Sequence, residues 1–256
     1  MLLAVDIGNT NISIGLYCED KLIFVSRLAT ERLRMPDQYA AELAAIFAMH
    51  SINTSEFQGA IISSVVPELT NVVKEAVGFI TEQTPLVLGP GVKTRLNIKI
   101  DNPAQLGADL VAGAVGAISS YPLPCLVLDM GTATKISVID EKGNYRGCTI
   151  SPGVKLSLNA LSAGASQLSS IPLDAPPSAI GTNTISSMQA GIVLGTAAMI
   201  EGLCKKIEVS LGEKPASIVA TGGIAADIIR YCDMDITLDE NLILDGLKAI
   251  YNKNTK

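Results

Sequence analysis

Apolar residues fall into short stretches and alternating patterns that predict strands in two parts of the chain. Residues 2–5 are apolar, and Ile12 and Ile14 follow at alternate positions. Residues 126–128 begin a second pattern of the same kind, which continues through 136–139. Alternation places one face of a strand in the core and leaves the other outside. Each pattern therefore predicts a β-hairpin.

Helices are predicted between the strands, where apolar residues recur at helical spacing or follow a proline that can start a helix. The predicted helices cover 36–49, a segment that opens at Pro67, 102–119 with Asn102 as its cap, an Ala- and Gly-rich segment from Thr184, and the C-terminal segment around Leu247. Buried strands are also predicted at 61–66 and 217–220. Strands that alternate with helices indicate an α/β protein with a mixed sheet in each half.

The two predicted hairpins carry the same turn sequence. Asp6-Ile7-Gly8 follows the first strand, and Asp129-Met130-Gly131 follows its counterpart in the second pattern. Chance is one explanation, because Asp and Gly are common in tight turns. Matching apolar stretches on both sides favour a duplication instead. We therefore predict two halves, residues 1–117 and 118–256, each built around one hairpin.

Composition excludes several classes of function. The 256 residues carry a formal net charge of −6 without clusters of Lys and Arg, which argues against a nucleic-acid partner. The five cysteines form no Cys-x-x-Cys pair, so neither a disulfide framework nor a zinc site is predicted. The richest apolar run, 190–200, is shorter than the roughly 18 residues of a membrane span, and no signal peptide opens the chain. A cytoplasmic protein without a membrane partner is expected.

The chain has a single histidine, His50, which directly follows an apolar stretch. A histidine in such a position usually ends a helix. If the protein is an enzyme, its general base is therefore expected to be a carboxylate, and a Ser-His-Asp or histidine-rich metal mechanism is disfavoured.

The first hairpin turn has the composition of a phosphate-binding loop. Gly8 permits a tight turn, and Asn9 and Thr10 supply donors beside exposed backbone N–H groups. An ordinary hairpin turn would look similar. Two such loops, one per half, would face each other across a cleft and could grip a nucleoside triphosphate, with Asp6 organising a divalent metal on the phosphates. The turn Thr221-Gly222-Gly223 is a third glycine-rich connection in this order.

These three motifs together resemble those of the acetate kinase, sugar kinase, heat-shock-70 and actin superfamily. Within it, the chain resembles the type III pantothenate kinases. The supporting motifs are Ser63-Ser64-Val65-Val66-Pro67, Asp101-Asn102-Pro103, Gly107-Ala108-Asp109, Ser151-Pro152-Gly153, Asn183-Thr184 and Leu244-Asp245-Gly246-Leu247. The resemblance implies duplicated ribonuclease H-like (actin-like ATPase) domains, in which mixed sheets are flanked by helices.

The resemblance also implies an activity and its requirements. The implied reaction transfers phosphate from ATP to the primary hydroxyl of pantothenate and gives 4'-phosphopantothenate, the first step of coenzyme A biosynthesis. The implied partners are the small-molecule substrate and a second copy of the chain in a homodimer. A divalent metal such as Mg²⁺ and a monovalent cation, K⁺ or NH₄⁺, are implied as cofactors.

Individual positions take roles from the same resemblance. The implied ATP contacts are Asp6, Ile7, Gly8, Asn9, Thr10, Asn11, Ile12, Ser13 and Thr132. The implied substrate contacts are Gly107, Ala108, Asp109, Leu110 and Thr184. Asp109 is the implied proton acceptor, and Asp129 is the implied ligand of the monovalent cation. From the residues alone Asp109 would be a solvated helix residue, but phosphoryl transfer depends mainly on positioning and charge, and a carboxylate suffices as its base.

Two positions at the substrate end depart from the family pattern. Leu110 stands where the family has Arg, and Ile100 stands where it has Tyr. An arginine there would pair with the substrate carboxylate or stabilise phosphoryl charge, and leucine can do neither. Two further differences, Met130 for a common Phe and Lys135 for a common Thr, are treated as minor.

Three interpretations follow from these departures. The first is a pantothenate kinase in which Lys93, Arg95 or Lys99 replaces the missing arginine. The second is a related kinase of a different, less acidic hydroxyl compound. The third is a nucleotide-binding regulator without activity, which the intact Asp6, Asp109, Asp129 and Thr184 disfavour.

Overall fold

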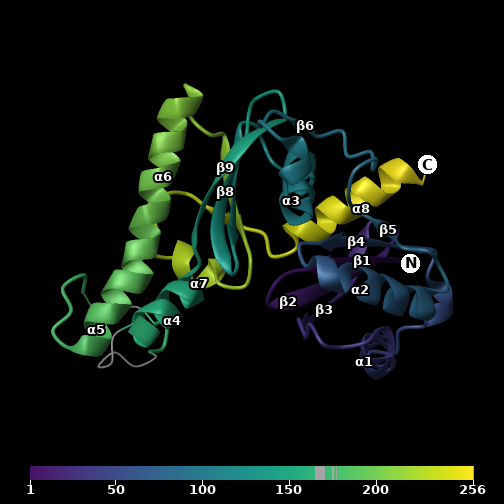
Figure 1. Cartoon of the computed structure of the whole chain (residues 1–256). Coiled ribbons are helices and arrows are strands. Elements are labelled where there is room, and N and C mark those ends of the chain that lie inside the picture. Colours follow the sequence, from purple (N-terminus) through teal and green to yellow (C-terminus); the bar gives the residue numbers. More distant parts are fainter. Residues whose placement is uncertain (165–170, 175, 177, 256) are drawn as a thin grey trace. The chain divides into compact units, whose positions relative to one another are not determined.

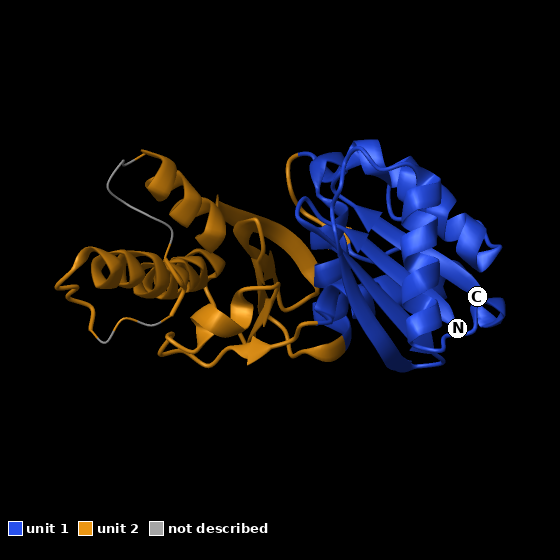
Figure 2. Ribbon diagram, turned by 90° about the horizontal axis from the view of Figure 1, so that it is seen from below, with its two compact units in different colours: residues 1–96, 102–119, 241–256 blue, residues 97–101, 120–240 orange. Residues whose placement is uncertain are grey.

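The computed structural model describes residues 1–164, 171–174, 176 and 178–255, which form an α/β protein with two sheets (Figure 1). Its residues divide into two compact units (Figure 2). Unit 1 contains residues 1–96, 102–119 and 241–256, and unit 2 contains residues 97–101 and 120–240. These units differ from the predicted halves of 1–117 and 118–256 mainly in two segments. Residues 241–256 belong to unit 1, and residues 97–101 belong to unit 2.

The sheet of unit 1 has the strand order β3-β2-β1-β4-β5. Its strands are β1 (Leu2–Ile7), β2 (Asn11–Cys18), β3 (Lys21–Ala29), β4 (Gly59–Ser64) and β5 (Leu86–Val87). Neighbours among β1, β2 and β3 pair antiparallel, whereas β4 pairs in parallel with β1 and β5. The helices are α1 (Pro36–Met49), α2 (Pro67–Thr81), α3 (Ala108–Ser120) and α8 (Leu242–Asn254), with short 3-10 turns η1 (Thr54–Glu56) and η2 (Pro103–Gln105).

Helices cover both faces of this sheet. Apolar residues of α1 and α2, such as Leu43 and Val73, share one core with Leu3, Val5 and Ile7 of β1. On the other side, α8 contacts β1, β2 and β4. Residues 3–5 of β1 are all buried, because both faces of this central strand are covered, and this explains why its sequence reads as a nearly continuous apolar run.

The sheet of unit 2 has the strand order β11-β10-β7-β8-β9-β6. Its strands are β6 (Asn97–Ile98), β7 (Cys125–Met130), β8 (Ala133–Ile139), β9 (Asn144–Pro152), β10 (Ser217–Thr221) and β11 (Thr237–Leu238). Its helices are α4 (Val154–Gly164), α5 (Thr184–Gln189), the π-helical turn η3 (Ala190–Leu194), α6 (Gly195–Leu211) and α7 (Ala225–Ile229). The order β9-β8-β7-β10-β11 matches β3-β2-β1-β4-β5, so the duplicated fold predicted from the two hairpins is confirmed.

Among the described residues, one helical segment, Thr184–Leu211, is long and apolar enough to cross a membrane by length and composition alone. The uninterrupted apolar run 190–200 forms only part of this segment. About one third of the segment's apolar window is buried. Val193, Ala197 and Ile200 from this segment pack in the core of unit 2, and a core helix of a soluble protein meets the same criterion.

The predicted helix 102–119 begins later than its sequence indicated. The side chain of Asn102 accepts a hydrogen bond from the backbone N–H of Ala104 (3.2 Å), so it caps the 3-10 turn η2 rather than α3. Helix α3 begins at Ala108, directly after Gly107. Asn102-Pro103 is a genuine cap and first-turn pair, but the turn that it starts lasts only three residues.

Helices α3 and α8 cross at two glycines. A Cβ atom on Gly116 would lie 2.3 Å from the carbonyl oxygen of Leu242, and one on Gly246 would lie 1.9 Å from that of Ala112. The backbones therefore touch directly, which explains the glycine in the Leu-Asp-Gly-Leu motif. The neighbouring Asp245 accepts a hydrogen bond from the hydroxyl of Tyr17 (2.7 Å), which ties α8 to β2.

This crossing yields a matched pair of substitutions on one helix. Gly116→Ala is expected to lower the free energy of unfolding by about 2 kcal/mol or more, because its methyl group would overlap backbone atoms. Gly113→Ala is expected to be neutral or stabilising by up to about 1 kcal/mol, because its methyl group would make an ordinary contact of 3.8 Å with Ile243 and alanine favours the helix. Urea unfolding of both variants measures the difference. Equal stability would contradict the close crossing.

Candidate active site

The conformation of the turn between β1 and β2 is fixed by hydrogen bonds within the turn and from Thr30, which follows β3. The N–H of Gly8 donates to the carbonyl oxygen of Asn11 (3.0 Å), which closes the turn. Thr30 holds both sides of it: its hydroxyl donates to the Gly8 carbonyl (2.7 Å), and its N–H donates to the Thr10 carbonyl (3.0 Å). Asn9, Thr10 and Asn11 are exposed. A rigid, exposed turn with polar side chains can receive an anion such as phosphate.

Residues of the predicted ATP loop separate into two sets. Asp6 lies opposite Ser13 of β2 and Ser63 of β4, so three polar residues form a row across neighbouring strands. Ile7 and Ile12 instead point into the core of unit 1 and are at most 1% exposed. These two isoleucines therefore offer a ligand their backbone groups only, and their side chains fix the strands that carry the loop.

The N-terminus of α3 lies next to the connection that follows β4. The N–H of Val65 donates to the carbonyl oxygen of Ile7 at the end of β1 (3.0 Å). A Cβ atom on Gly107 would lie 3.6 Å from a methyl group of Val65. The end of β1, the Ser-Ser-Val-Val-Pro motif and the Gly-Ala-Asp motif are thus brought together within unit 1, although they are far apart in the sequence.

Asp109 occupies the first turn of α3. Its Oδ1 accepts a hydrogen bond from the backbone N–H of Leu110 (2.7 Å), and a Cβ atom on Gly107 would approach that oxygen to 2.6 Å. Glycine at position 107 therefore leaves room for the carboxylate. A carboxylate is favourable at a helix N-terminus because the helix dipole is positive there, and the same field attracts an anionic ligand.

The β7–β8 turn of unit 2 repeats the closure of the first loop. The N–H of Gly131 donates to the carbonyl oxygen of Ala133 (3.1 Å), and Thr132 is exposed. Gly153 packs against this turn so closely that a Cβ atom would lie 2.4 Å from the carbonyl oxygens of Gly131 and Thr132. Gly222, which directly follows β10 and has φ at +99°, packs against the backbone of Met130 at the end of β7. The Ser-Pro-Gly and Thr-Gly-Gly motifs thus have a packing role around the second loop.

Asp129 faces a lysine across the second hairpin. Asp129 on β7 and Lys135 on β8 are direct cross-strand partners, which places their side chains on the same face of the sheet. Lys135 Nζ donates to Asp129 Oδ2 at 2.7 Å. The side chain of Lys135 is only 18% exposed, and that of Asp129 is 15% exposed. Lys135, a difference from the family pattern that seemed minor in the sequence, therefore contacts Asp129, the implied cation ligand, directly.

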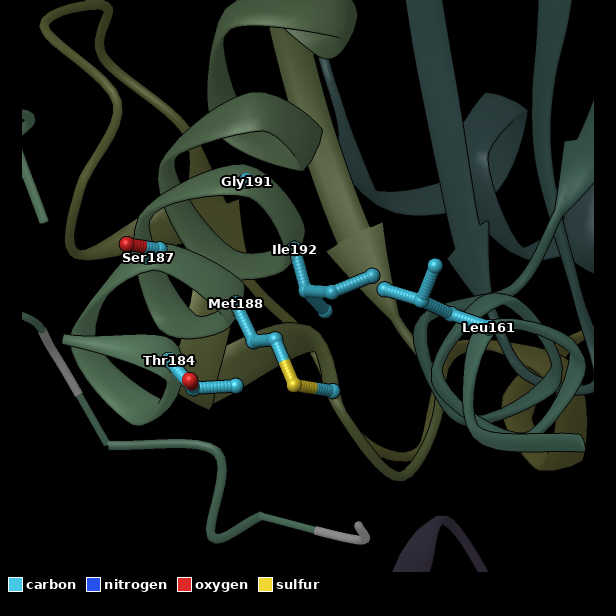
Figure 3. Close-up of a pocket in the computed structure, with 6 residues that line it drawn as sticks. All are labelled: Leu161, Thr184, Ser187, Met188, Gly191 and Ile192. Carbon is cyan, nitrogen blue, oxygen red and sulfur yellow. The ribbon is translucent and has the colours of Figure 1, made fainter. Parts of the chain in front are cut away.

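Thr184 lies at the start of α5, where Asn183 caps the helix by accepting from the N–H of Ser186 (2.9 Å). Thr184 lines an open pocket with a volume of about 440 Å³, together with Leu161, Ser187, Met188, Gly191 and Ile192 (Figure 3). The side chains around it are mainly apolar. This pocket belongs to unit 2, whereas Asp109 belongs to unit 1.

The three candidates for the missing arginine lie in two places. The backbone N–H of Lys93 donates a hydrogen bond to Asn254 Oδ1 at the end of α8 (3.0 Å), and Asn254 Nδ2 donates one to the Lys93 carbonyl (3.0 Å). Lys253 donates to the Thr94 carbonyl (3.3 Å), and its pKa is lowered by burial and by the nearby charge of Arg95. Lys99 instead follows β6, with its N–H donating to the Tyr145 carbonyl (2.8 Å) in unit 2.

Two further observations concern residue types that often carry chemistry. Within the described ranges, no three His, Cys, Asp or Glu side chains come together as a metal site. All five cysteines are free thiols. Burial raises the pKa of Cys204 to about 12 and that of Cys232 to about 11, which makes both poor nucleophiles.

Comparison with known proteins identifies the kind of protein that carries this site. The family model of type III pantothenate kinases matches residues 2–206. A type III pantothenate kinase of Brevibacillus brevis is 40% identical over 254 residues, covering 99% of each chain, and one of an Exiguobacterium species is 38% identical over 256 residues, covering 100% of each. Component A of (R)-2-hydroxyglutaryl-CoA dehydratase from Acidaminococcus fermentans has a similar solved structure, with a TM-score of 0.58 and 14% identity over 100% of this chain and 99% of the other.

At 14% identity, the solved structure is informative about the fold alone, and it agrees with the actin-like ATPase fold expected from the motifs. The sequence matches reach further, because they span essentially the full length of both chains at about 40% identity. The chain belongs to the type III pantothenate kinase family, a family of kinases.

Proposed function

We propose that this protein transfers the γ-phosphate of ATP to the primary hydroxyl of pantothenate and so forms 4'-phosphopantothenate, the first step of coenzyme A biosynthesis. One observation carries the proposal beyond family membership: Asp109 stands at the N-terminus of α3, and the same segment packs beside the end of β1, which leads into the first glycine loop. The carboxylate proposed as proton acceptor and the turn proposed to bind phosphate thus belong to segments that pack together within one compact unit.

Each loop residue has a role in the proposed reaction. The turn from Asp6 to Ser13 binds phosphate oxygens through its backbone and polar side chains, and Thr132 makes a further ATP contact. Gly107, Ala108, Leu110 and Thr184 contact the substrate. Asp109 orients the hydroxyl and accepts its proton as the oxygen attacks phosphorus, and ADP leaves. Because the transition state is loose, this carboxylate needs correct placement more than high basicity.

A divalent cation fits this chain as a partner of the nucleotide. Asp6 supplies one carboxylate, and Ser13 and Ser63 stand beside it in the same row. Hard oxygen donors of this kind suit Mg²⁺, which commonly binds through one or two carboxylates together with substrate phosphates and water. When bound with ATP, the ion would neutralise charge on the phosphates. At Asp129, the ammonium group of Lys135 is already on the carboxylate, so a free K⁺ or NH₄⁺ does not fit there.

The protein is further proposed to act as a cytoplasmic homodimer without nucleic-acid or membrane partners. The net charge of −6 disfavours binding to phosphate backbones. The segment 184–211 leaves Gly191, Gly195 and Gly202 exposed, and small residues at such spacing permit close approach of a second helix. Sedimentation equilibrium measures the oligomeric state directly.

The proposed reaction is tested by ADP release with MgATP and purified protein. Turnover should depend on pantothenate and should be absent with compounds that lack its primary hydroxyl. A panel of other small alcohols serves as the comparison. Demonstrable ATP binding without pantothenate-stimulated ADP release would overturn the substrate assignment and leave the nucleotide-binding assignment standing.

A kinase of a different hydroxyl compound is the second candidate, because Leu110 places an apolar side chain beside Asp109 where an arginine would pair with the substrate carboxylate. A charged hydrogen bond contributes about 1.5–3 kcal/mol, so Leu110→Arg should raise kcat/KM for pantothenate roughly tenfold to a hundredfold if no other cation fills the role. Leu110→Gln is the control without charge. Steady-state kinetics with pantothenate and with its uncharged alcohol analogue separate carboxylate recognition from a general effect.

The two candidates predict different outcomes for this substitution. An increase confined to pantothenate would mean that the natural chain recognises its carboxylate weakly and would favour the second candidate. Unchanged kinetics would mean that another cation, such as Lys93, Arg95 or Lys99, already meets the carboxylate.

A further inference from the structure

The pair formed by Asp129 and Lys135 lies on the hairpin that carries the second glycine loop. The two residues are direct cross-strand partners, and Thr132 lies in the turn between their strands. The ammonium nitrogen lies 2.7 Å from Asp129 Oδ2, and both side chains are largely removed from solvent. Lysine therefore places a fixed positive charge within three residues of an implied ATP contact.

A free monovalent cation does not fit beside this pair. The resemblance assigns such an ion to the Asp129 position in a family that commonly has threonine where this chain has Lys135. Here an ion at the same carboxylate would have to approach the lysine ammonium closely, and two positive charges at that separation repel strongly in a partly buried site.

We infer that the ammonium group of Lys135 replaces the monovalent cation, so that this protein functions without K⁺ or NH₄⁺. A primary ammonium carries the same single positive charge as either ion and is an alkyl derivative of NH₄⁺ with three N–H donors. Because it is tethered opposite Asp129, its occupancy does not depend on the concentration of any ion. The effect of this replacement on catalysis rests on the proposed function. The exclusion of the ion from Asp129 does not depend on that function, because it follows from the contact with Lys135.

The alternative role for Lys135 is purely structural. A cross-strand ion pair can stabilise a hairpin without influencing the nucleotide. Removing the lysine would then lower stability under all ionic conditions alike. Replacement of a cation predicts something different: a variant without the lysine should regain a specific response to K⁺, because an ion at Asp129 would no longer meet the ammonium group of Lys135.

The test compares the wild-type protein, Lys135→Thr and the control Lys142→Thr. Lys142 belongs to the turn between β8 and β9, and its side chain is 76% exposed. Two quantities are measured at constant ionic strength in choline, Na⁺, K⁺ and NH₄⁺ chlorides: the midpoint of thermal unfolding and the affinity for MgADP by calorimetry. Neither measurement requires turnover, so both remain decisive if pantothenate proves not to be the substrate.

For the wild type and Lys142→Thr, replacing choline by K⁺ or NH₄⁺ should leave the unfolding midpoint unchanged and the nucleotide affinity within about twofold. For Lys135→Thr, nucleotide affinity should fall about tenfold in choline and recover in K⁺ or NH₄⁺, with a matching rise in the unfolding midpoint. A K⁺-specific response of the wild type would overturn the inference. So would a folded Lys135→Thr protein that ignores K⁺. If Lys135→Thr does not fold, the wild-type measurements decide alone.

Turnover gives an additional readout that distinguishes the two proposals. The wild type should phosphorylate pantothenate at the same rate with and without K⁺, and Lys135→Thr should require K⁺. A wild type that turns over no pantothenate in any salt would contradict the proposed substrate, while its ion-independent nucleotide binding would still support the role of Lys135.

Discussion

Replacing Asp109 by asparagine is expected to lower turnover with pantothenate by about a thousandfold, because general-base groups typically contribute a hundredfold to ten-thousandfold. Asparagine keeps the size of the side chain and can still accept the hydrogen bond from the Leu110 N–H, so the start of α3 should remain intact. Only the ability to take the proton of the hydroxyl is lost. Single-turnover phosphoryl transfer measures the loss, and calorimetry with MgADP should find nucleotide affinity within about twofold of wild type.

Asp37→Asn is the matched control. Asp37 lies in the first turn of α1, is exposed, and belongs to the same compact unit as Asp109. It shares the helix-terminal position and the charge change, but it belongs to a different helix and is not a residue of the glycine loop. Wild-type rates for Asp37→Asn combined with a large loss for Asp109→Asn support the assignment. If both variants keep more than about a tenth of wild-type turnover, Asp109 is not the proton acceptor.

Asp6→Asn should have the second largest effect, a decrease in kcat/KM for MgATP of about a hundredfold or more, which is the scale of losing one preorganised charge at a phosphoryl-transfer site. Asp6 is the carboxylate in the polar row of β2, β1 and β4, at the end of the strand that enters the first loop. Its amide would hold Mg²⁺ on the nucleotide less well. The variant should therefore need a higher Mg²⁺ concentration for half-maximal rate.

Glu19→Gln provides the control for this change. Glu19 lies between β2 and β3, outside the first glycine loop, and is exposed. Its conversion to an amide removes the same charge from the same unit. A Mg²⁺ dependence of Asp6→Asn that matches Glu19→Gln and wild type would exclude a metal-organising role for Asp6.

The repeated hairpins and their loops could be predicted from sequence because their signals are local. Alternating apolar residues defined the paired strands, and the sheet order confirms that one arrangement occurs twice. Asp6 and Asp129 each lie at the end of the first strand of their hairpin. Roles carried by the family resemblance, such as that of Asp109, remain proposals that kinetics must test.

Other features depend on contacts between distant segments and could not be predicted locally. Helix α8 packs in unit 1 because Gly116 and Gly246 allow two backbones to touch, and neither glycine reveals its partner in the sequence. Helix α3 begins at Ala108 because the cap at Asn102 starts only a short turn. Lys135 seemed a minor difference, and its meaning emerged only from the register that places it opposite Asp129.

Phosphorylation of pantothenate by the wild-type protein can be observed by ³¹P NMR of the complete reaction with MgATP and pantothenate in choline buffer. One new phosphomonoester signal is expected, coupled to the protons of the primary carbinol carbon and formed in equal amount to ADP, and its rate of formation should be the same after K⁺ is added. ADP formation without that signal, or no consumption of ATP while nucleotide binding is intact, would contradict pantothenate as the substrate.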